Sequence, residues 1–368
     1  MRLRDIKLTQ YRNCTNLELD LNSNKVLITG KNAQGKTNIL ESIYILSCLK
    51  SPRTSNNADL INFNAKKTEV HCNLFKSNTD IELKFIYSDD KKRELYLNGL
   101  KTTPKNFKTV LKTVLFSTAD LMLLRGNPTD RRDWLDRAIS QVYPAYDERL
   151  SKYDKIRIQK NNLLKENLKT GNLNETLLDV YNEQLVIGGS NIIFLRKKFL
   201  KEIESIASQK HKIISESENL KIFYDCSFLS NDEFEPENIA QAFKQAVVEH
   251  RIEEIRRGQA CVGPHRDDII FYINENEATK FASQGQQRTI VLALKLSELD
   301  IIAQKTGDEP ILLLDDVLAE LDDIRQNYLL KSINDNTQTV ITSVDTLLFE
   351  EEFLKDVKIY KIENGKII

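Results

Sequence analysis

The sequence carries at residues 30–37 the stretch Gly30-Lys31-Asn32-Ala33-Gln34-Gly35-Lys36-Thr37. This stretch fits the phosphate-binding pattern G-x-x-x-x-G-K-[ST] at every specified position. A short apolar run, residues 26–28, predicts a buried strand before it, and helical apolar spacing follows it from Lys36 to Leu49. Glycines let backbone N–H groups face phosphates, and a helix N-terminus adds positive potential. We therefore expect all eight residues to bind the phosphates of ATP.

A second element of the same chemistry is the run Ile311-Leu312-Leu313-Leu314-Asp315-Asp316. It reads as a buried strand that ends in two carboxylates, the Walker B element that a P-loop protein needs beside its phosphates. We expect Lys36 to reach the β- and γ-phosphates, and Thr37 and Asp315 to hold Mg²⁺. Asp316 is placed to orient or deprotonate the attacking water.

The spacing of these motifs separates classes of P-loop protein. Between Thr37 and Ile311 lie 273 residues, far more than a small GTPase or kinase has, and such an insertion is typical of ABC-type heads and their SMC relatives. Before the Walker B strand, residues 282–288 read Ala-Ser-Gln-Gly-Gln-Gln-Arg and open a predicted helix, which resembles the ABC signature. That resemblance implies that Ser283 and Gly285 contact the γ-phosphate of an ATP held by a second subunit. The alternative is a capped helix start with Ser283 as N-cap.

The rest of the chain predicts an α/β fold: an ABC-type P-loop ATPase head with mixed sheets and flanking helices, interrupted by a helical arm or lobe. Residues 68–97 suggest antiparallel strands, with a hairpin at Asn98-Gly99. Residues 145–213 suggest two long antiparallel helices broken near Gly171-Asn172, in either a protruding arm or a compact lobe. After residue 220, helices at 236–256 and 286–305 alternate with strands at 269–273, 311–314 and 339–342, which suggests a mostly parallel sheet. The predicted head comprises residues 1–140 and 220–368, and the predicted insert residues 141–219.

Composition excludes several classes of protein. The 368 residues are 40% hydrophobic and 29% charged with a net charge of −1, the profile of a soluble globular protein. No apolar run approaches a membrane span, and the N-terminus is no secretory signal. The five cysteines have no zinc or redox spacing and are expected to be free thiols. Residues 151–212 carry 12 Lys and Arg against 7 Asp and Glu, whereas residues 298–368 carry 7 against 16. A phosphate-seeking surface is therefore expected away from the C-terminal part.

Several further stretches resemble the RecF family, and with the ATPase motifs they extend from the N-terminus to about residue 345. They are Tyr11-Arg12-Asn13, Lys50-Ser51-Pro52-Arg53-Thr54, residues 116–121, residues 126–136 (Gly-Asn-Pro-Thr-Asp-Arg-Arg-Asp-Trp-Leu-Asp) and Gly263-Pro264-His265-Arg266-Asp267-Asp268. The resemblance implies an ATP-dependent homodimer that binds DNA at gaps. It also implies action with RecO and RecR to load RecA in recombinational repair, the DNA damage (SOS) response and replication restart, in a bacterial cytoplasm without membrane partners.

The chain departs from common ABC patterns at a few positions. Asp316 stands where transport ATPases carry Glu, and because Asp is one methylene shorter we expect slow hydrolysis. Gln284 replaces the first signature glycine, and Ser343 lies where many ABC proteins have a switch histidine. Asp120 is the candidate for the Q-loop neighbourhood. Arg53 follows the P-loop helix where SMC-like heads carry a phosphate-facing arginine, although it could also be a surface residue.

The sequence leaves some alternatives open. Arg131 and Arg132 could contact DNA or form a structural ion-pair network, and His265 and Arg266 could support an active site or only pack a loop. No residue is assigned to DNA. The nucleotide-binding subunit of an ABC transporter and an SMC-like tether are the alternative functions, and both fit the helical insert less well.

Overall fold

The computed structural model describes residues 1–230, 233–333 and 336–368. The chain forms two compact units. Unit 1 comprises residues 1–122 and 288–368, and unit 2 comprises residues 123–287. The predicted insert, residues 141–219, lies inside unit 2, which also contains residues on either side of it.

Unit 1 contains two six-stranded sheets. The first is antiparallel, in the order β2-β1-β4-β5-β6-β7, and consists of β1 (Arg2–Tyr11), β2 (Cys14–Asp20), β4 (Lys67–Lys76), β5 (Thr79–Ser88), β6 (Arg93–Leu97) and β7 (Leu100–Lys101). The second has the order β15-β14-β3-β13-β12-β8 and consists of β3 (Lys25–Thr29), β8 (Thr113–Ser117), β12 (Ile311–Asp315), β13 (Thr339–Ser343), β14 (Val357–Glu363) and β15 (Lys366–Ile367). All its pairs are parallel except β14–β15.

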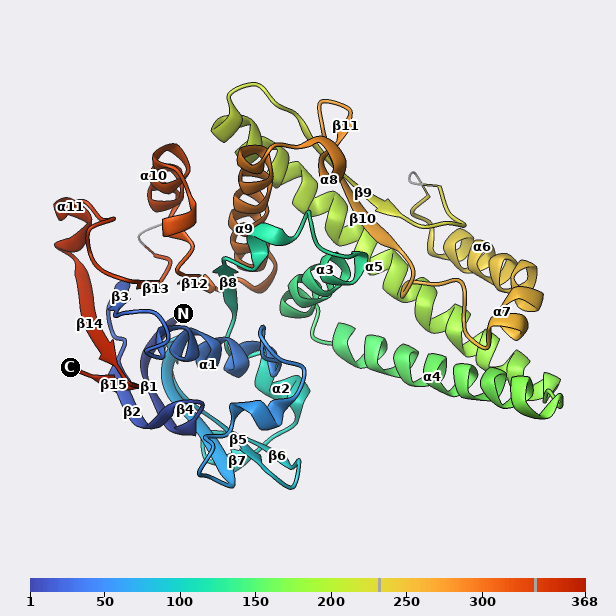
Figure 1. The fold of residues 1–368 in the computed structure, drawn as a ribbon, viewed down its shortest axis with the longest axis horizontal. Coiled ribbons are helices and arrows are strands. Elements are labelled where there is room, and N and C mark those ends of the chain that lie inside the picture. The colour runs from blue at the N-terminus through green and yellow to red at the C-terminus, as the bar shows by residue number, and fades with distance from the viewer. Residues whose placement is uncertain (231–232, 334–335) are drawn as a thin grey trace. The chain divides into compact units, whose positions relative to one another are not determined.

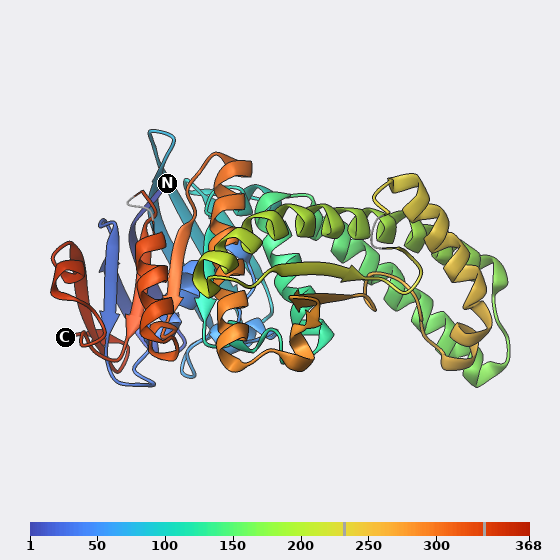
Figure 2. The same ribbon diagram turned by 90° about the horizontal axis from the view of Figure 1, so that it is seen from above.

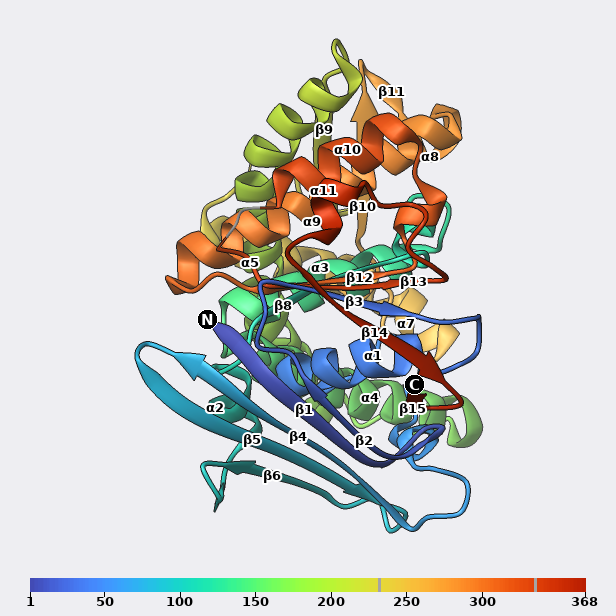
Figure 3. The ribbon, with the colours of Figure 1, turned by 90° about the vertical axis from the view of Figure 1, so that its left-hand side faces the viewer.

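Helix α1 (Lys36–Cys48) lies between these two sheets, as Figure 3 shows. Eleven of its residues are buried, because a helix between two layers has almost no solvent face. The helix therefore holds the phosphate-binding stretch rigidly at its first turn. The other helices of unit 1 are α2 (Pro104–Lys108), α10 (Asp323–Ser332), α11 (Glu351–Leu354), the 3₁₀ turns η1 (Asn57–Leu60), η2 (Asp120–Met122) and η3 (Leu318–Glu320), and α9 (Gln284–Thr306), which belongs to unit 1 from Arg288 onward.

The strands follow their sequence patterns. In β12 and β13 the apolar run is buried along its whole length, as expected for parallel strands covered on both faces. In β4 buried and less buried residues alternate, as expected for an antiparallel strand with one face toward the core. The predicted Asn98-Gly99 hairpin is confirmed: β6 and β7 pair antiparallel, and both turn residues have positive φ.

Unit 2 is mainly helical. Its elements are α3 (Pro128–Val142), α4 (Tyr146–Thr170), α5 (Glu175–Ser215), β9 (Leu220–Asp225), α6 (Pro236–Glu249), α7 (Arg251–Arg257), β10 (Asp268–Ile273), β11 (Asn276–Glu277) and α8 (Ala278–Phe281). The two long helices predicted for residues 145–213 are confirmed as α4 and α5, which pack side by side (Figure 1). Gly171 ends α4 with a φ of 68°, which glycine adopts without strain.

Two sequence predictions in this region were wrong. The strand at 269–273 does not join a parallel sheet: as β10 it pairs antiparallel with β9 in a three-stranded sheet that lies along α5 (Figure 2). Both strands alternate between buried and less buried residues, which is typical of an antiparallel sheet with one uncovered face. The helix predicted at 236–256 is broken at His250, whose backbone N–H donates to the Ala246 carbonyl and whose ring Nδ1 lies 2.9 Å from the same oxygen.

Candidate nucleotide-binding site

The backbone conformation of the P-loop depends on two glycines. Gly30 has a φ of 151° and Gly35 a φ of 110°. A Cβ at Gly30 would lie 2.4 Å from the carbonyl oxygen of Ile362, and one at Gly35 would lie 2.9 Å from the Asn13 side-chain oxygen. Both positions therefore require glycine. Lys31, Asn32 and Ala33 are exposed at the tip of the loop.

Lys36 points its ammonium group into the loop. Its Nζ donates to the carbonyl oxygens of Gly30 (2.7 Å) and Lys31 (3.3 Å) and lies 3.7 Å from Asp316 Oδ2. The residue is only 3% exposed. A buried cation enclosed by the curve of the loop is positioned to meet phosphate oxygens.

Thr37 and Asp315 meet although they are 278 residues apart in the chain. The Thr37 hydroxyl donates to Asp315 Oδ1 over 2.9 Å, and the Thr342 hydroxyl donates to the same oxygen over 2.9 Å. Burial raises the pKa of the Asp315 carboxyl, which the two hydroxyl bonds lower in part. A hydroxyl beside a carboxylate is a suitable pair of oxygen ligands for Mg²⁺.

Asp316 follows directly and takes a strained backbone conformation. Its φ is 51°, which is uncommon for a non-glycine residue and is found more often at functional sites. Its backbone N–H donates to the Thr342 hydroxyl over 2.9 Å. The carboxylate is therefore turned toward Lys36.

Arg53 lies near the start of α1 and is held by two α1 side chains. Its guanidinium donates to the Asn38 side-chain oxygen over 2.7 Å and lies 3.6 Å from Glu41, while half of the side chain remains exposed. Glu41 is fully buried and also receives two hydrogen bonds from Arg12, of 3.0 and 2.6 Å. Glu41, which the sequence motifs do not indicate, therefore positions both arginines.

Ser283 and Gly285 stand at the start of α9. The Ser283 hydroxyl accepts from the Gln286 N–H over 3.2 Å, and the Gln286 side chain accepts from the Ser283 N–H over 2.8 Å. This reciprocal pair is a capping box. The alternative prediction, that Ser283 caps the start of this helix, is therefore confirmed. Ser283 is exposed, as is the neighbouring Phe281. The cap leaves the serine accessible to a second molecule. Both signature residues belong to unit 2, whereas the P-loop belongs to unit 1.

Asp120 and Ser343, the candidates for the Q-loop and switch positions, both have defined places in unit 1. The Asp120 carboxylate accepts from the backbone N–H and the hydroxyl of Ser117, both over 2.8 Å, and pairs with Lys295 at 3.0 Å. The Asp120 carboxylate therefore stabilises the C-terminal end of β8 and points toward Ser117 and Lys295. Ser343 is buried at the end of β13, and Thr342 rather than Ser343 contacts the Walker B carboxylate.

The comparison with known proteins bears on the whole chain. The RecF/RecN/SMC N terminal domain family matches residues 2–368. The DNA replication and repair protein RecF of Bacillus subtilis (strain 168) is 37% identical over the full length of both chains. The RecF protein of Geobacillus kaustophilus (strain HTA426) is 38% identical over all of this chain and 99% of that relative. The chain belongs to the RecF family.

Solved structures agree with this membership. The recombination mediator protein RecF-ATP in the RecFOR pathway superposes with a TM-score of 0.91 at 32% identity, covering 100% of this chain and 97% of that one. The Smc head bound to the C-winged helix domain of ScpA gives a TM-score of 0.55 at 14% identity, with 100% and 97% covered, and shows the shared fold. The predicted ABC-type head is thereby confirmed.

The stretch Tyr11-Arg12-Asn13, which resembles RecF, has a place in this geometry. The Asn13 amide donates to the Gln34 carbonyl over 3.2 Å, and its side-chain oxygen accepts from Asn38 over 2.7 Å. Asn13 therefore braces the P-loop from the turn between β1 and β2, next to Gly35.

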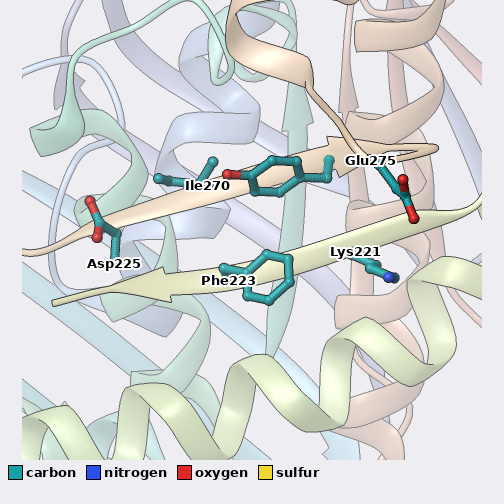
Figure 4. Close-up of a pocket in the computed structure, with 6 residues that line it drawn as sticks. Lys221, Phe223, Asp225, Ile270 and Glu275 are labelled. Atoms are coloured by element: carbon teal, nitrogen blue, oxygen red, sulfur yellow. The ribbon is translucent and has the colours of Figure 1, made fainter. Parts of the chain in front are cut away.

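Outside the nucleotide site, the uncovered face of the β9–β10 sheet forms a shallow hollow in unit 2. Figure 4 shows the residues that line it, and Tyr272 and Phe223 meet there edge to face with ring centroids 5.3 Å apart. The remaining lining residues are Lys221, Asp225, Ile270 and Glu275. None of the predicted site residues lies in this hollow. In the described part of the chain no helix is long and apolar enough to cross a membrane.

Proposed function

We propose that this protein is an ATP-dependent switch that binds DNA in recombinational repair and replication restart. The observation that carries the proposal is the Thr37–Asp315 contact beside the buried Lys36 ammonium. It brings the two Walker elements together in the arrangement that a nucleoside triphosphate needs. The RecF-ATP structure at 32% identity supports ATP as that nucleotide.

ATP would be held by the whole loop, Gly30 to Thr37, with Lys36 against its β- and γ-phosphates. Thr37 and Asp315 would hold Mg²⁺, since a hydroxyl and a carboxylate 2.9 Å apart fit its preference for oxygen ligands. When bound, this ion neutralises phosphate charge. Asp316 orients the attacking water, and Arg53, half exposed beside the start of α1, stabilises γ-phosphate charge.

The second half of the site would come from another copy of the chain. Ser283 and Gly285 lie at an exposed helix start, and the helix N-terminus favours an anion. An ATP that contacts both subunits binds the dimer more tightly than the monomer, so it shifts the equilibrium toward the dimer.

The DNA and partner roles rest on family membership. We infer that the ATP-bound dimer binds duplex DNA at gaps and acts with RecO and RecR to promote RecA loading in the bacterial cytoplasm. The solved RecF-ATP relative, a recombination mediator protein in the RecFOR pathway, supports this assignment.

The composite site predicts a dimer that depends on both halves. In sedimentation velocity with ATP–Mg²⁺, wild type is expected to sediment as a dimer, whereas Ser283→Arg is expected to stay monomeric at about tenfold higher protein concentration. The added side chain puts bulk and positive charge where the serine would approach the partner's nucleotide. Addition of a gapped duplex should further increase the sedimentation coefficient of the wild-type dimer.

The matched control is Asn172→Arg, at an exposed position in the turn between α4 and α5, which should dimerise with ATP–Mg²⁺ as wild type does. Both variants should keep the ATP affinity of the wild-type monomer. Dimerisation of Ser283→Arg at wild-type concentration would refute the role of Ser283 in the partner's site. A wild type that is monomeric with ATP yet binds DNA equally well without it would refute the switch itself.

Hydrolysis is expected to be slow even in the assembled dimer. The short Asp316 side chain is held near Lys36 on a strained backbone, so it aligns water less well than the longer Glu of transport ATPases. We expect single-turnover rates well below the common enzyme value of about 10 per second. Asp316→Asn should lower the rate about tenfold further while preserving ATP-dependent dimerisation.

Quench-flow of radiolabelled ATP on the preassembled dimer measures this rate directly. Fast single-turnover hydrolysis by wild type would contradict the alignment argument. An unchanged rate in Asp316→Asn would show that another group prepares the water.

A further inference from the structure

Two stretches that the nucleotide site does not use come together in unit 2. They are residues 126–136, which lead into α3 and form its first part, and residues 263–268, a loop that ends at the first residue of β10. Arg131 makes a two-point contact with the Asp268 carboxylate, with distances of 2.8 and 2.7 Å. Arg132 donates to the Asp267 carbonyl over 2.7 Å. These contacts hold the loop against α3.

The same loop is pressed against α4. A Cβ at Gly263, whose φ is 123°, would lie 2.5 Å from the Tyr153 hydroxyl and 2.8 Å from Phe243. The Tyr153 hydroxyl lies 2.8 Å from His265 Nδ1. Burial, and then the charge of Arg157, lowers the pKa of His265 to about 3. The ring is therefore neutral at pH 7, and it packs the loop onto α4.

Three arginines lie close to this neutral histidine: Arg132 from α3, Arg157 from α4 and Arg266 from the loop. Arg266 donates to the Ala260 carbonyl over 3.5 Å, and the His265 Nε2 lies 3.4 Å from the same oxygen. Arg132 donates to the carbonyl of the loop residue Asp267. Arg157 lies one helical turn after Tyr153 on α4, and Arg266 is next to His265 in sequence. Arg266 is exposed, while Arg132 and Arg157 are half-buried. We call these three side chains the arginine cluster.

The cluster carries more positive charge than its neighbours neutralise. Arg157 pairs with Asp154 at 3.0 Å on the same helix. Within residues 1–230, 233–333 and 336–368, neither Arg132 nor Arg266 makes an ion pair with a carboxylate.

The three carboxylates whose charges act on Arg132 are already engaged with other partners. Asp268 binds Arg131, Asp136 binds Arg196, and buried Asp267 accepts from the Tyr224 hydroxyl over 2.5 Å. The cluster is therefore held in place by a rigid base while part of its charge remains unpaired.

Further cations lie on α4. A hollow between α4 and α5 is lined by Arg149, Lys152 and Tyr153, together with apolar and amide side chains. Arg149 and Arg157 are eight residues apart, or about 12 Å along the helix. Cations spaced along one helix match a ligand with repeated negative charges better than they match a single ion.

We propose that the arginine cluster, Arg132, Arg157 and Arg266, binds backbone phosphates of DNA, with Arg149 and Lys152 continuing the contact along α4. The inference rests on the proposed DNA-binding function and deepens it by assigning residues. Guanidinium groups present forked donors that match phosphate oxygens, and such contacts position a duplex without reading its sequence.

The test measures affinity for a gapped duplex by fluorescence anisotropy, with ATP–Mg²⁺, from about 50 to about 200 mM KCl. Arg266→Glu is expected to weaken binding at least about tenfold at the lowest salt and to reduce the slope of log K against log salt by about one. Arg266→Lys keeps the charge and should stay within about threefold of wild type. The matched control is Arg256→Glu, an exposed arginine on α7 with the same change of charge, which should leave affinity and slope unchanged.

The outcomes separate this inference from the function on which it rests. A wild type that binds no DNA under any of these conditions would refute the DNA-binding function. A wild type that binds, with Arg266→Glu equal to it in affinity and slope, would refute the arginine cluster alone. A thermal shift with inorganic phosphate that is lost in Arg266→Glu, while DNA affinity stays intact, would assign the site to free phosphate and overturn the proposal. Equal melting temperatures and ATP affinities of all variants verify that the fold is kept.

Discussion

Replacing Lys36 by alanine is expected to weaken ATP–Mg²⁺ binding by about 100-fold or more, which corresponds to about 3 kcal/mol. Lys36 brings a buried ammonium to the interior of the loop, where its Nζ donates to the Gly30 and Lys31 carbonyls. Phosphate oxygens would replace these carbonyls as partners in a site of low effective dielectric, where a charge pair is stronger than in water. Isothermal titration calorimetry measures the change in affinity.

The matched control for this prediction is Lys31→Ala in the same loop. Lys31 would contribute its backbone N–H to the loop, which alanine keeps. Its side chain is exposed and screened by solvent, so the substitution should change ATP affinity less than about threefold. Unfolding of the Lys36→Ala variant without nucleotide should remain cooperative. Equal losses of affinity in both variants would show that general loop charge, and not the buried ammonium, binds the phosphates.

The core of the nucleotide site could be predicted from the sequence because its parts are local. A glycine-rich loop between a strand and a helix specifies its own backbone, and an apolar strand that ends in Asp315 specifies where a carboxylate emerges. The Thr37–Asp315 contact then follows, since β3 and β12 both flank β13 in one parallel sheet and so bring their carboxyl ends to one edge.

The supporting residues could not be predicted because their partners come from distant strands and loops. Glu41 lies in the buried stretch Leu40-Glu41-Ser42 of α1, and a carboxylate there needs a cation. Nothing in the sequence indicates that Arg12 and Arg53 supply it. The β9–β10 sheet was missed for a related reason: its strands are separated by two helices and pair only through tertiary packing.

The sequence alone also could not decide whether Arg131 and Arg132 form structural ion pairs or are available to DNA. Both fall on one predicted helix, and a helical pattern does not distinguish a buried ion pair from an exposed cation. In the structure, Arg131 is buried and bound to Asp268, while Arg132 has no carboxylate partner among the described residues. Arg131 thus forms the structural ion pair, whereas the DNA contact of Arg132 stays a proposal.

The second large effect concerns the stability of unit 2. Arg196 is 2% exposed and makes a two-point contact with Asp136, both distances being 2.9 Å. Its third nitrogen donates to the Pro264 carbonyl over 2.5 Å and to the Tyr224 hydroxyl over 3.3 Å. Arg196 therefore joins α5 to α3, to β9 and to the loop that carries the arginine cluster.

Arg196→Met is expected to destabilise unit 2 by about 3–5 kcal/mol, because it leaves the mostly buried Asp136 carboxylate without its cation. Trp134, the only tryptophan, is buried in α3 and reports the unfolding of this unit by fluorescence in urea. The surface control is Arg257→Met, which removes an exposed pair with Glu253 on α7 and should cost less than about 1 kcal/mol.

The double variant Arg196→Met with Asp136→Leu separates the two contributions to this cost. If the loss comes from an unpaired buried charge, removal of both partners should be less destabilising than removal of Arg196 alone. If the double variant loses as much as the sum of the single variants, the stabilisation comes instead from the bonds to Pro264 and Tyr224. The loop at 263–268 would then depend on Arg196 directly, and DNA binding through the arginine cluster should fall in both variants that lack Arg196.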